Sequence, residues 1–173
     1  MARNIEIKAR IANVEALLPR ALALGDGTAT RIAQDDTFFV CDRGRLKLRA
    51  FADGTGELIH YQRADEAGPK ASDYVVAPVT QSAPLREALD RALGTHGRVV
   101  KLRTLVVVGA TRIHLDRVEG LGDFLELEVV LTPERSDADG QAEAQRVMDA
   151  LGIAPGALLQ GAYLDLLERQ RSA

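Results

Sequence analysis

Residues 4–11 read Asn4-Ile5-Glu6-Ile7-Lys8-Ala9-Arg10-Ile11 and alternate strictly between polar or charged residues and apolar residues. A strand has a side-chain period of two, so such a segment places one set of side chains on each face of a sheet. The segment therefore predicts a half-buried strand. Its isoleucines and Ala9 pack in a core, and its other face carries a row of mixed charge.

The same alternation recurs along the chain. The charged members of these later segments are Arg45, Lys47 and Arg49; Lys101 and Arg103; Arg112, His114 and Asp116; and Glu126 and Glu128. If such strands close into a barrel with helices covering the apolar outside, the charged faces meet in a polar tunnel. Lysines and arginines there would bind a polyanion, and carboxylates would hold a divalent metal ion. The pattern alone leaves an open sheet with a solvated charged face as the alternative.

The rest of the sequence predicts an α+β arrangement of strands joined by short turns, with helices outside. Strands are expected at 4–11, 30–41, 45–51, 57–63, 72–79, 98–108, 110–118 and 123–131, and helices at 14–24, 84–93, from Asp137 or Asp139 to about 151, and near 163–169. Pro19 predicts a kink in the first helix or its division into two short pieces. Leu85, Leu89 and Leu93 have core spacing in the second. Residues 64–71 predict a loop at the tunnel mouth.

Composition and length restrict the class of protein. At 173 residues the chain suits one compact domain, residues 1–173. A net charge of −3 and the lack of a long basic run argue against a nucleic-acid partner. The single cysteine, Cys41, excludes an intrachain disulfide and a cysteine-based metal cluster. No signal peptide precedes the first strand, and no apolar run approaches the roughly 20 residues that cross a bilayer. We therefore expect a cytoplasmic protein with no membrane partner.

Several motifs follow one another over nearly the whole chain. They are Asn4-x-Glu6-x-Lys8, Gln34-x-Asp36-Thr37-Phe38-Phe39, Leu46-Lys47-Leu48-Arg49, Glu57-Leu58-Ile59-x-Tyr61-x-Arg63, Ser72-Asp73-Tyr74, Lys101-x-Arg103, the stretch from Arg112 to Glu128, and Tyr163-x-Asp165-Leu166-Leu167. Together they resemble the CYTH family of triphosphate tunnel metalloenzymes, which includes class IV adenylyl cyclases, thiamine triphosphatases and inorganic triphosphatases. The resemblance implies a closed antiparallel β-barrel of about eight strands with helices outside, and it decides for the barrel over the open sheet.

The charged rows supply the candidate site residues. A triphosphate is a chain of like charges, so its site needs several spaced cations and a metal ion that bridges phosphate oxygens. The candidates for phosphate contact are Lys8, Lys47, Arg49, Arg63, Lys101 and Arg103, with Arg112 and Arg45 nearer strand ends. The best carboxylates for Mg²⁺ or Mn²⁺ are Glu6, Glu126 and Glu128, followed by Asp116 and Asp36. The resemblance implies Glu6, Asp116, Glu126 and Glu128 at the family's acidic positions. We assign catalytic roles to Glu6, Glu126 and Lys8.

These residues predict a divalent-metal-dependent phosphohydrolase that acts on inorganic triphosphate or a triphosphorylated small molecule. Tripolyphosphate, ATP and thiamine triphosphate are the candidate substrates, and we expect a monomer or a homodimer. A class IV-like adenylyl cyclase, forming cyclic AMP and pyrophosphate from ATP, is the first alternative. The second is a triphosphate-binding module without turnover, because Asn4 stands where the family signature has a glutamate. The sequence has no Walker-type loop, no HExxH helix and no Gly-x-Ser-x-Gly elbow.

Overall fold

The computed structural model describes residues 2–63 and 69–173, without the side chains of Ala2 and Arg63. Its strands are β1 Ala2–Arg10, β2 Thr30–Phe39, β3 Arg45–Ala50, β4 Gly56–Arg63, β5 Lys70–Val79, β6 Thr95–Val108, β7 Thr111–Val118 and β8 Gly122–Leu131. Its α-helices are α1 Val14–Leu24, α2 Ser82–Leu93, α3 Asp137–Leu151 and α4 Tyr163–Arg171, with a short 3₁₀ helix at Pro155–Ala157.

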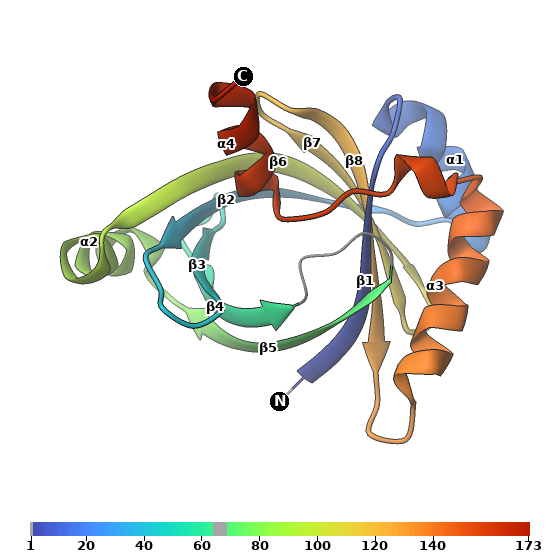
Figure 1. Cartoon of the computed structure of the whole chain (residues 1–173), viewed down its shortest axis with the longest axis horizontal. Helices are drawn as coiled ribbons and strands as arrows, with labels where there is room; N and C mark the ends of the chain where they lie inside the picture. The colour runs from blue at the N-terminus through green and yellow to red at the C-terminus, as the bar shows by residue number, and fades with distance from the viewer. Residues whose placement is uncertain (1, 64–68) are drawn as a thin grey trace.

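The strands form one closed antiparallel ring in the order β1-β5-β4-β3-β2-β6-β7-β8, with β8 paired back to β1 (Figure 1). This confirms the α+β barrel predicted from the sequence. In the closing pair, Glu6 lies opposite Glu128 and Lys8 opposite Glu126. Directly opposed residues in an antiparallel pair share a face of the sheet. The charged rows of the first and last strands therefore meet inside the ring, although they lie over a hundred residues apart in the sequence.

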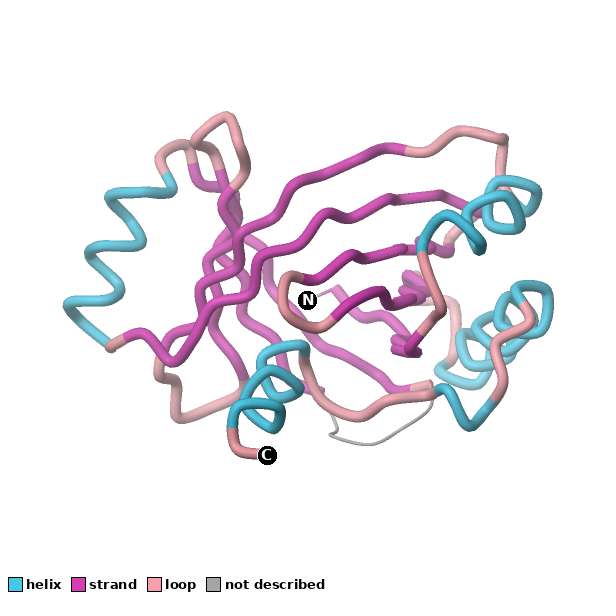
Figure 2. The backbone as a smooth tube through the Cα atoms, turned by 90° about the horizontal axis from the view of Figure 1, so that it is seen from above, coloured by secondary structure: helices cyan, strands magenta, loops and turns pink. Residues whose placement is uncertain are grey.

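Helices α1 and α3 cover one side of the ring from outside (Figure 2). The apolar partners of the charged rows, such as Ile7, Leu115 and Leu127, pack there against Val147 and Leu151 of α3. Removing these side chains from water is the main force that holds the helices to the strands. The outward faces of β1, β7 and β8 are thus apolar because helices cover them, and their inward faces are free to carry charge.

Helix α4 packs against the ring on another side, next to β6. Its first residues, Tyr163 and Leu164, are buried with Phe38, Val99 and Phe124 in a second apolar cluster. The rings of Phe124 and Tyr163 pack with their centroids 5.0 Å apart. A simple alternation predicts an interior that is polar along its whole length. The structure differs, because aromatic side chains fill the inner end.

Two helices differ from the sequence expectation. Helix α1 is one continuous helix, so the division into two pieces does not occur, and Pro19 lies exposed on it. Helix α2 starts at Ser82, before Pro84, since proline is tolerated in a first helical turn. The core spacing predicted for α2 holds only in part: Leu85 and Leu89 are half-buried, whereas Leu93 is 41% exposed, and α2 lies at one edge of the molecule in Figure 1. Most of the loop predicted at 64–71 falls outside the described residues, and Lys70 already belongs to β5.

Candidate functional site

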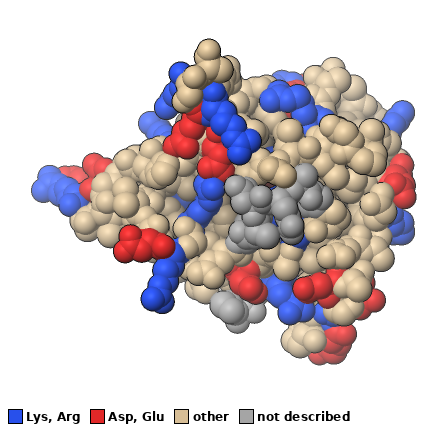
Figure 3. Space-filling view, viewed as in Figure 1, with Lys and Arg blue, Asp and Glu red and all other residues tan. Residues whose placement is uncertain are grey.

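Inward-facing side chains from all eight strands line one cavity of about 480 Å³. The basic residues that line it are Lys8, Lys47, Arg49, Lys70, Lys101, Arg103 and Arg112, and the acidic ones are Glu6, Asp36, Glu57, Glu126 and Glu128. All four lysines of the sequence belong to this set, whereas the arginines are spread over the molecule. On the face shown in Figure 3, basic and acidic side chains are interspersed. The concentration of cations is thus a property of the cavity and not of that surface.

Asp36 anchors two of these cations on the wall formed by β2 and β3. Lys47 Nζ lies 2.9 Å from Asp36 Oδ2, and Arg49 donates through Nε and Nη2 to the two carboxylate oxygens at 2.8 and 2.9 Å. Burial alone would raise the pKa of Asp36, but Arg49 and Lys47 outweigh it and hold that pKa well below its usual value. Burial and the neighbouring Arg49 lower the pKa of Lys47 to about 8. The side chains of Lys47 and Arg49 are therefore fixed in place before any ligand arrives.

Asp116 anchors the cations on the wall formed by β6 and β7. Arg103 donates to its two oxygens at 2.7 and 2.6 Å, and the Tyr163 hydroxyl donates at 2.9 Å. Lys101 Nζ lies 3.6 Å away. Burial raises the pKa of the Asp116 carboxyl, but Arg103 and Lys101 outweigh it and bring that pKa down to about 2. Burial and Arg103 lower the pKa of Lys101 to about 8. Asp116 is fully buried behind these cations and is not among the residues that line the cavity.

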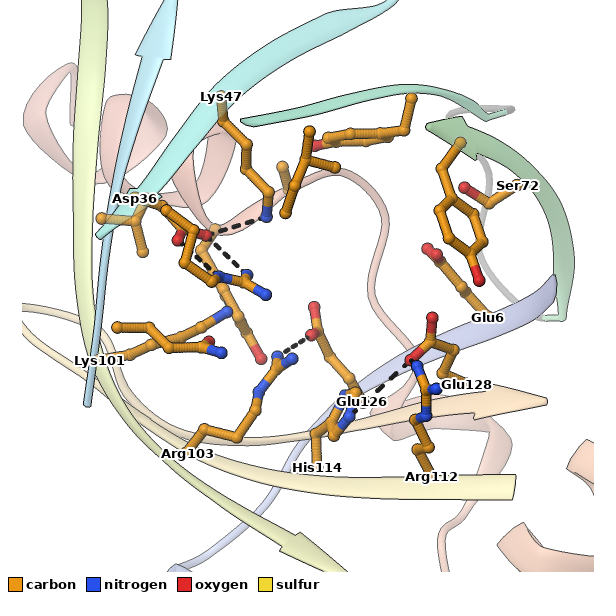
Figure 4. Close-up of a pocket in the computed structure, with 18 of the residues that line it drawn as sticks. Glu6, Asp36, Lys47, Ser72, Lys101, Arg103, Arg112, His114, Glu126 and Glu128 are labelled. Atoms are coloured by element: carbon orange, nitrogen blue, oxygen red, sulfur yellow. Dashed lines mark hydrogen bonds and ion pairs between the residues drawn. The ribbon is translucent and has the colours of Figure 1, made fainter. Parts of the chain in front are cut away.

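Glu126 reaches the centre of the cavity (Figure 4). Its oxygens lie 3.1 Å from Lys8 Nζ and 2.5 Å from Arg103 Nη2. Burial would raise the pKa of Glu126, but Lys8, Lys101 and Arg103 hold it well below its usual value. Lys8 also donates to the Gly161 carbonyl at 3.0 Å. The segment that leads into α4 thus helps to position Lys8 against Glu126.

Glu128 and Glu6 occupy the opposite wall, on β8 and β1 (Figure 4). Asn4 donates through Nδ2 to Glu128 Oε1 at 2.5 Å, and Arg112 Nη1 lies 3.3 Å from Oε2. His114 Nε2 is 3.9 Å from the same oxygen. Burial, reinforced by Arg103, keeps the pKa of His114 well below its usual value, so the imidazole is neutral near pH 7. The cavity is therefore polarised, with Lys47, Lys101 and Arg103 on one side and Glu6 and Glu128 on the other.

The donor atoms near Glu128 fit a hard divalent cation in their chemistry. Carboxylate and amide oxygens are the ligands that Mg²⁺ and Mn²⁺ accept, and Asn4 Oδ1 is buried without a hydrogen-bond partner. The described residues include no group of three or more His, Cys, Asp or Glu side chains already gathered as a metal cage. The ion pairs explain this, because Glu126 and Glu128 each contact a basic side chain. Glu6, Glu126 and Glu128, with Asn4 Oδ1, are the residues that would hold the ion.

The structure brings together most of the residues predicted from the sequence. Lys8, Lys47, Arg49, Lys101, Arg103, Arg112, Glu6, Glu126 and Glu128 all line the cavity. Arg112 lies nearer its edge, with a side chain that is about half exposed. The predicted contact of Arg63 falls outside the described side chains, although its backbone pairs with Ser72. Arg45 is absent from the lining, because it binds Asp165 of α4 at 2.7 Å.

Three lining residues were not among the assigned site residues: Tyr163, for which core packing was favoured over ligand contact, Lys70, which was left open between a surface and a site role, and Glu57. Tyr163 looked like a core residue, but its ring lies 3.9 Å below Lys8 Nζ and its hydroxyl binds Asp116. Its position at the start of a helix carries no strand alternation that would reveal an inward direction. Lys70 belongs to a segment that looked like loop, and Glu57 begins a strand after a glycine-rich turn.

Comparison with known proteins agrees with this geometry. A sequence model described as the CYTH domain matches residues 2–163. No protein of curated function matches the chain by sequence. Among solved structures, a Pyrococcus horikoshii protein superimposes with a TM-score of 0.82 at 23% identity, covering 95% of this chain and 99% of that one. A candidate adenylate cyclase from Vibrio parahaemolyticus gives a TM-score of 0.76 at 18% identity, covering 95% and 97%.

A third neighbour carries a name that includes an activity. It is a candidate adenylyl cyclase from Hippeastrum described as having a dominant triphosphatase activity. It superimposes with a TM-score of 0.66 at 15% identity, covering 98% of this chain and 96% of that one. At these identities the neighbours show a shared fold. In the described part of this chain, no helix is both long and apolar enough to cross a bilayer.

Proposed function

Because the chain belongs to the CYTH domain family, we propose that it is a divalent-metal-dependent phosphohydrolase that acts on a triphosphate. The observation that carries the proposal is the gathering of seven basic side chains from five strands in one cavity inside the ring. Burying so many like charges opposes folding, so their retention is best explained by an anionic ligand. A chain of phosphates matches cations that are spread along the cavity rather than gathered at one point.

When a triphosphate binds, we expect its oxygens to replace carboxylate oxygens as partners of the basic side chains. In the free protein Asp36 and Glu126 accept hydrogen bonds or ion pairs from Lys47, Arg49 and Arg103. Phosphate oxygens would take over part of this role, since guanidinium groups bind phosphate and carboxylate with the same geometry. The cations are therefore positioned for phosphate before it enters, and little side-chain freedom is lost on binding.

Hydrolysis requires a water molecule to attack phosphorus while negative charge is offset on the phosphate oxygens. Arg103 and Lys8 lie beside Glu126, where they would stabilise that charge. Glu126 lies in the middle of the cavity and would orient the attacking water through its carboxylate. A divalent ion held by Glu6, Glu126 and Glu128 would supply further charge neutralisation at the phosphates. We therefore propose catalytic roles for Glu6, Glu126 and Lys8, supported by these positions.

A class IV-like adenylyl cyclase is the second candidate, and the names of two structural neighbours favour keeping it. The same cations would hold the phosphates of ATP, but the attacking group would be the ribose 3′-hydroxyl and the leaving group pyrophosphate. The products separate the two reactions. Cyclic AMP and pyrophosphate indicate the cyclase, whereas ADP and phosphate indicate the hydrolase.

The proposal is tested by incubating purified protein with tripolyphosphate, ATP and thiamine triphosphate in the presence of Mg²⁺ or Mn²⁺. We expect phosphate release that stops on addition of a chelator and falls by at least about tenfold in Glu126→Gln. Glu119→Gln, which changes an exposed carboxylate outside the cavity, is the matched control and should keep full activity. Binding of triphosphate without any product would support the binding module and reject the enzyme.

A further inference from the structure

Two buried oxygen atoms of the cavity wall have no hydrogen-bond partner among the described residues. They are Asn4 Oδ1 on β1 and Ser72 Oγ on β5, and each of the two residues is 1% exposed. Both residues line the cavity, and they lie directly opposite each other in the pair of β1 and β5. Directly opposed residues of an antiparallel pair are near neighbours on one face. Leaving a buried polar atom unpaired costs free energy, so two neighbouring ones indicate a place for a ligand.

Glu128 sets the orientation of the Asn4 amide. Asn4 Nδ2 donates to Glu128 Oε1 at 2.5 Å. A carboxylate accepts hydrogen bonds and has no hydrogen to donate, so the nitrogen of the amide must face it. Because the amide group is planar, its oxygen is then turned away from Glu128. Asn4 Oδ1 is therefore left for a group that carries positive charge or a hydrogen.

The charges around this oxygen pair favour a cation. Figure 4 shows Ser72 on the same side of the cavity as Glu6 and Glu128, which are directly opposed on β1 and β8. Another unpaired oxygen of the lining, Gln34 Oε1, lies on the opposite wall, where Gln34 pairs with Lys101. A cation would be repelled there, so the two kinds of unpaired oxygen are not equivalent.

The chemistry of the two atoms narrows the ligand further. A phosphate oxygen is negatively charged and offers no hydrogen to an amide oxygen, so a phosphate would not pair with Asn4 Oδ1. Hydroxyl, amide and carboxylate oxygens are instead the ligands of hard divalent cations. The oxygen pair thus suits the ion and not the substrate.

We propose that Ser72 and Asn4 supply a pair of neutral oxygen ligands to the divalent cation, beside the carboxylates of Glu6 and Glu128. This inference rests on the proposed function, because the ion belongs to it, and it adds Ser72 on β5 as a residue that positions the ion. The pair supplies oxygen ligands without adding charge. Since the number of charged ligands tunes how tightly a site holds a hard cation, the pair lowers the affinity of the site below that of an all-carboxylate set.

The test measures the binding of Mn²⁺ to the metal-free protein without any triphosphate, by titration calorimetry or by the electron paramagnetic resonance signal of free Mn²⁺. Ser72→Ala removes one neutral oxygen and should raise the Kd at least about threefold. Asn4→Asp replaces the amide oxygen by a charged one and should lower the Kd at least about threefold. The same change should lower the melting temperature of the metal-free protein, since the new carboxylate faces that of Glu128.

Thr37→Val is the matched control. Thr37 Oγ1 is a further buried hydroxyl without a partner in the described part of the chain, but Thr37 is not among the residues that line the cavity. Its removal should leave the Kd for Mn²⁺ unchanged. Ser72→Thr keeps a hydroxyl on β5 and should keep most of the affinity that Ser72→Ala loses.

The outcomes separate the inference from the proposed function. Unchanged Mn²⁺ binding in both Ser72→Ala and Asn4→Asp would overturn the inference and leave the proposed function standing. The expected pattern of Mn²⁺ binding without turnover of any triphosphate would support the site and remove the hydrolase. No binding of Mn²⁺ to wild type, alone or with tripolyphosphate, would remove both. Melting curves show whether each variant is folded, and if Ser72→Ala is not, the Kd of Asn4→Asp decides alone.

Discussion

At the scale of single residues, the carboxylates of the cavity form two groups. Asp36 and Asp116 are almost fully buried and hold the cations, whereas Glu126 and Glu128 keep part of their surface in the open cavity. The first group acts through Arg49 and Arg103, and the second is available to water and metal. The sequence alternation placed all of these acids inward, but it does not distinguish an anchor from a ligand. That distinction depends on how deeply each side chain is buried.

Asp116 is fully buried, so removing its partner Arg103 should lower the free energy of unfolding strongly. Arg103→Met leaves a fully buried carboxylate with Tyr163 and Lys101 as its remaining contacts, so we expect a loss of about 3–5 kcal/mol in the free energy of unfolding. Combining it with Asp116→Asn removes the unpaired charge and should restore part of that stability. Urea unfolding of the two single variants and the double variant gives the coupling energy. Additive effects would contradict a direct interaction between the pair.

The lowered pKa of Lys47 predicts that this residue stabilises the protein more as the pH rises. Its pKa is lowered to about 8 in the folded chain, while the unfolded chain keeps a value near 10.5. Between these values the unfolded state binds more protons, so this residue makes the free energy of unfolding rise with pH. Stability relative to Lys47→Met should therefore increase from pH 7.5 to pH 10. Urea unfolding of both proteins at several pH values measures the difference, and a constant difference would contradict the assignment.

The residues that sequence reasoning missed share a cause. Alternation identifies inward side chains only within a recognised strand, and Glu6, Arg49 and Arg103 were found in this way. Tyr163 enters the cavity from the end of a helix, and its contact with Asp116 joins residues 47 apart in the chain. No local pattern encodes such a contact, because it depends on where α4 docks.

At the scale of elements, the fit between α3 and the ring depends on a glycine. Gly140 is in the first half of α3, where a Cβ atom would lie 2.6 Å from Ile5 Cγ1 and 2.8 Å from Leu131 Cδ2. Gly140→Ala should improve helix propensity by up to about 1 kcal/mol. We nevertheless expect a net loss of about 1–3 kcal/mol, since overpacking forces β1 and α3 apart.

The matched control for this change lies on the exposed side of the same helix. Ala142→Gly alters propensity in the opposite sense without touching the ring, so it should lose about 1 kcal/mol. Thermal or urea unfolding measures both variants. A stabilised Gly140→Ala protein would show that α3 can move outward without cost, and the close approach of the helix would then have no role in stability.

Most element positions followed from the sequence because period-two and period-3.6 patterns are local. Helix α2 shows the limit of that reasoning. Its leucines have the spacing of a buried face, yet Leu93 is 41% exposed, and polar contacts such as the 3.0 Å hydrogen bond from Arg86 to Asp35 also hold the helix. Spacing predicts which residues share a face but not whether another element covers that face.

At the scale of the whole molecule, closure of the ring converts local alternation into a binding site. The decisive pairing joins β1 to β8, and a one-residue shift there would turn Glu6 and Lys8 outward. The alternation pattern is equally compatible with an open sheet, so sequence reasoning reached the barrel through family resemblance. Closure also gathers every lysine of the chain in one cavity, a distribution that no single segment reveals.

Because all lysines of the sequence line the cavity, chemical modification of amines can detect a ligand bound there. An amine-reactive reagent can modify only Lys8, Lys47, Lys70, Lys101 and the α-amino group of the chain. Lys47 and Lys101 should react at pH 8, because their pKa values of about 8 leave a large unprotonated fraction at that pH. A bound triphosphate would contact the same nitrogens and exclude the reagent. Peptide mass spectrometry with and without saturating tripolyphosphate or ATP should therefore show strong protection of Lys47 and Lys101 and no protection of the α-amino group. If the rates at which both lysines are modified do not change when ligand is present, and binding is established independently, the triphosphate does not contact the walls that carry Lys47 on β3 and Lys101 on β6.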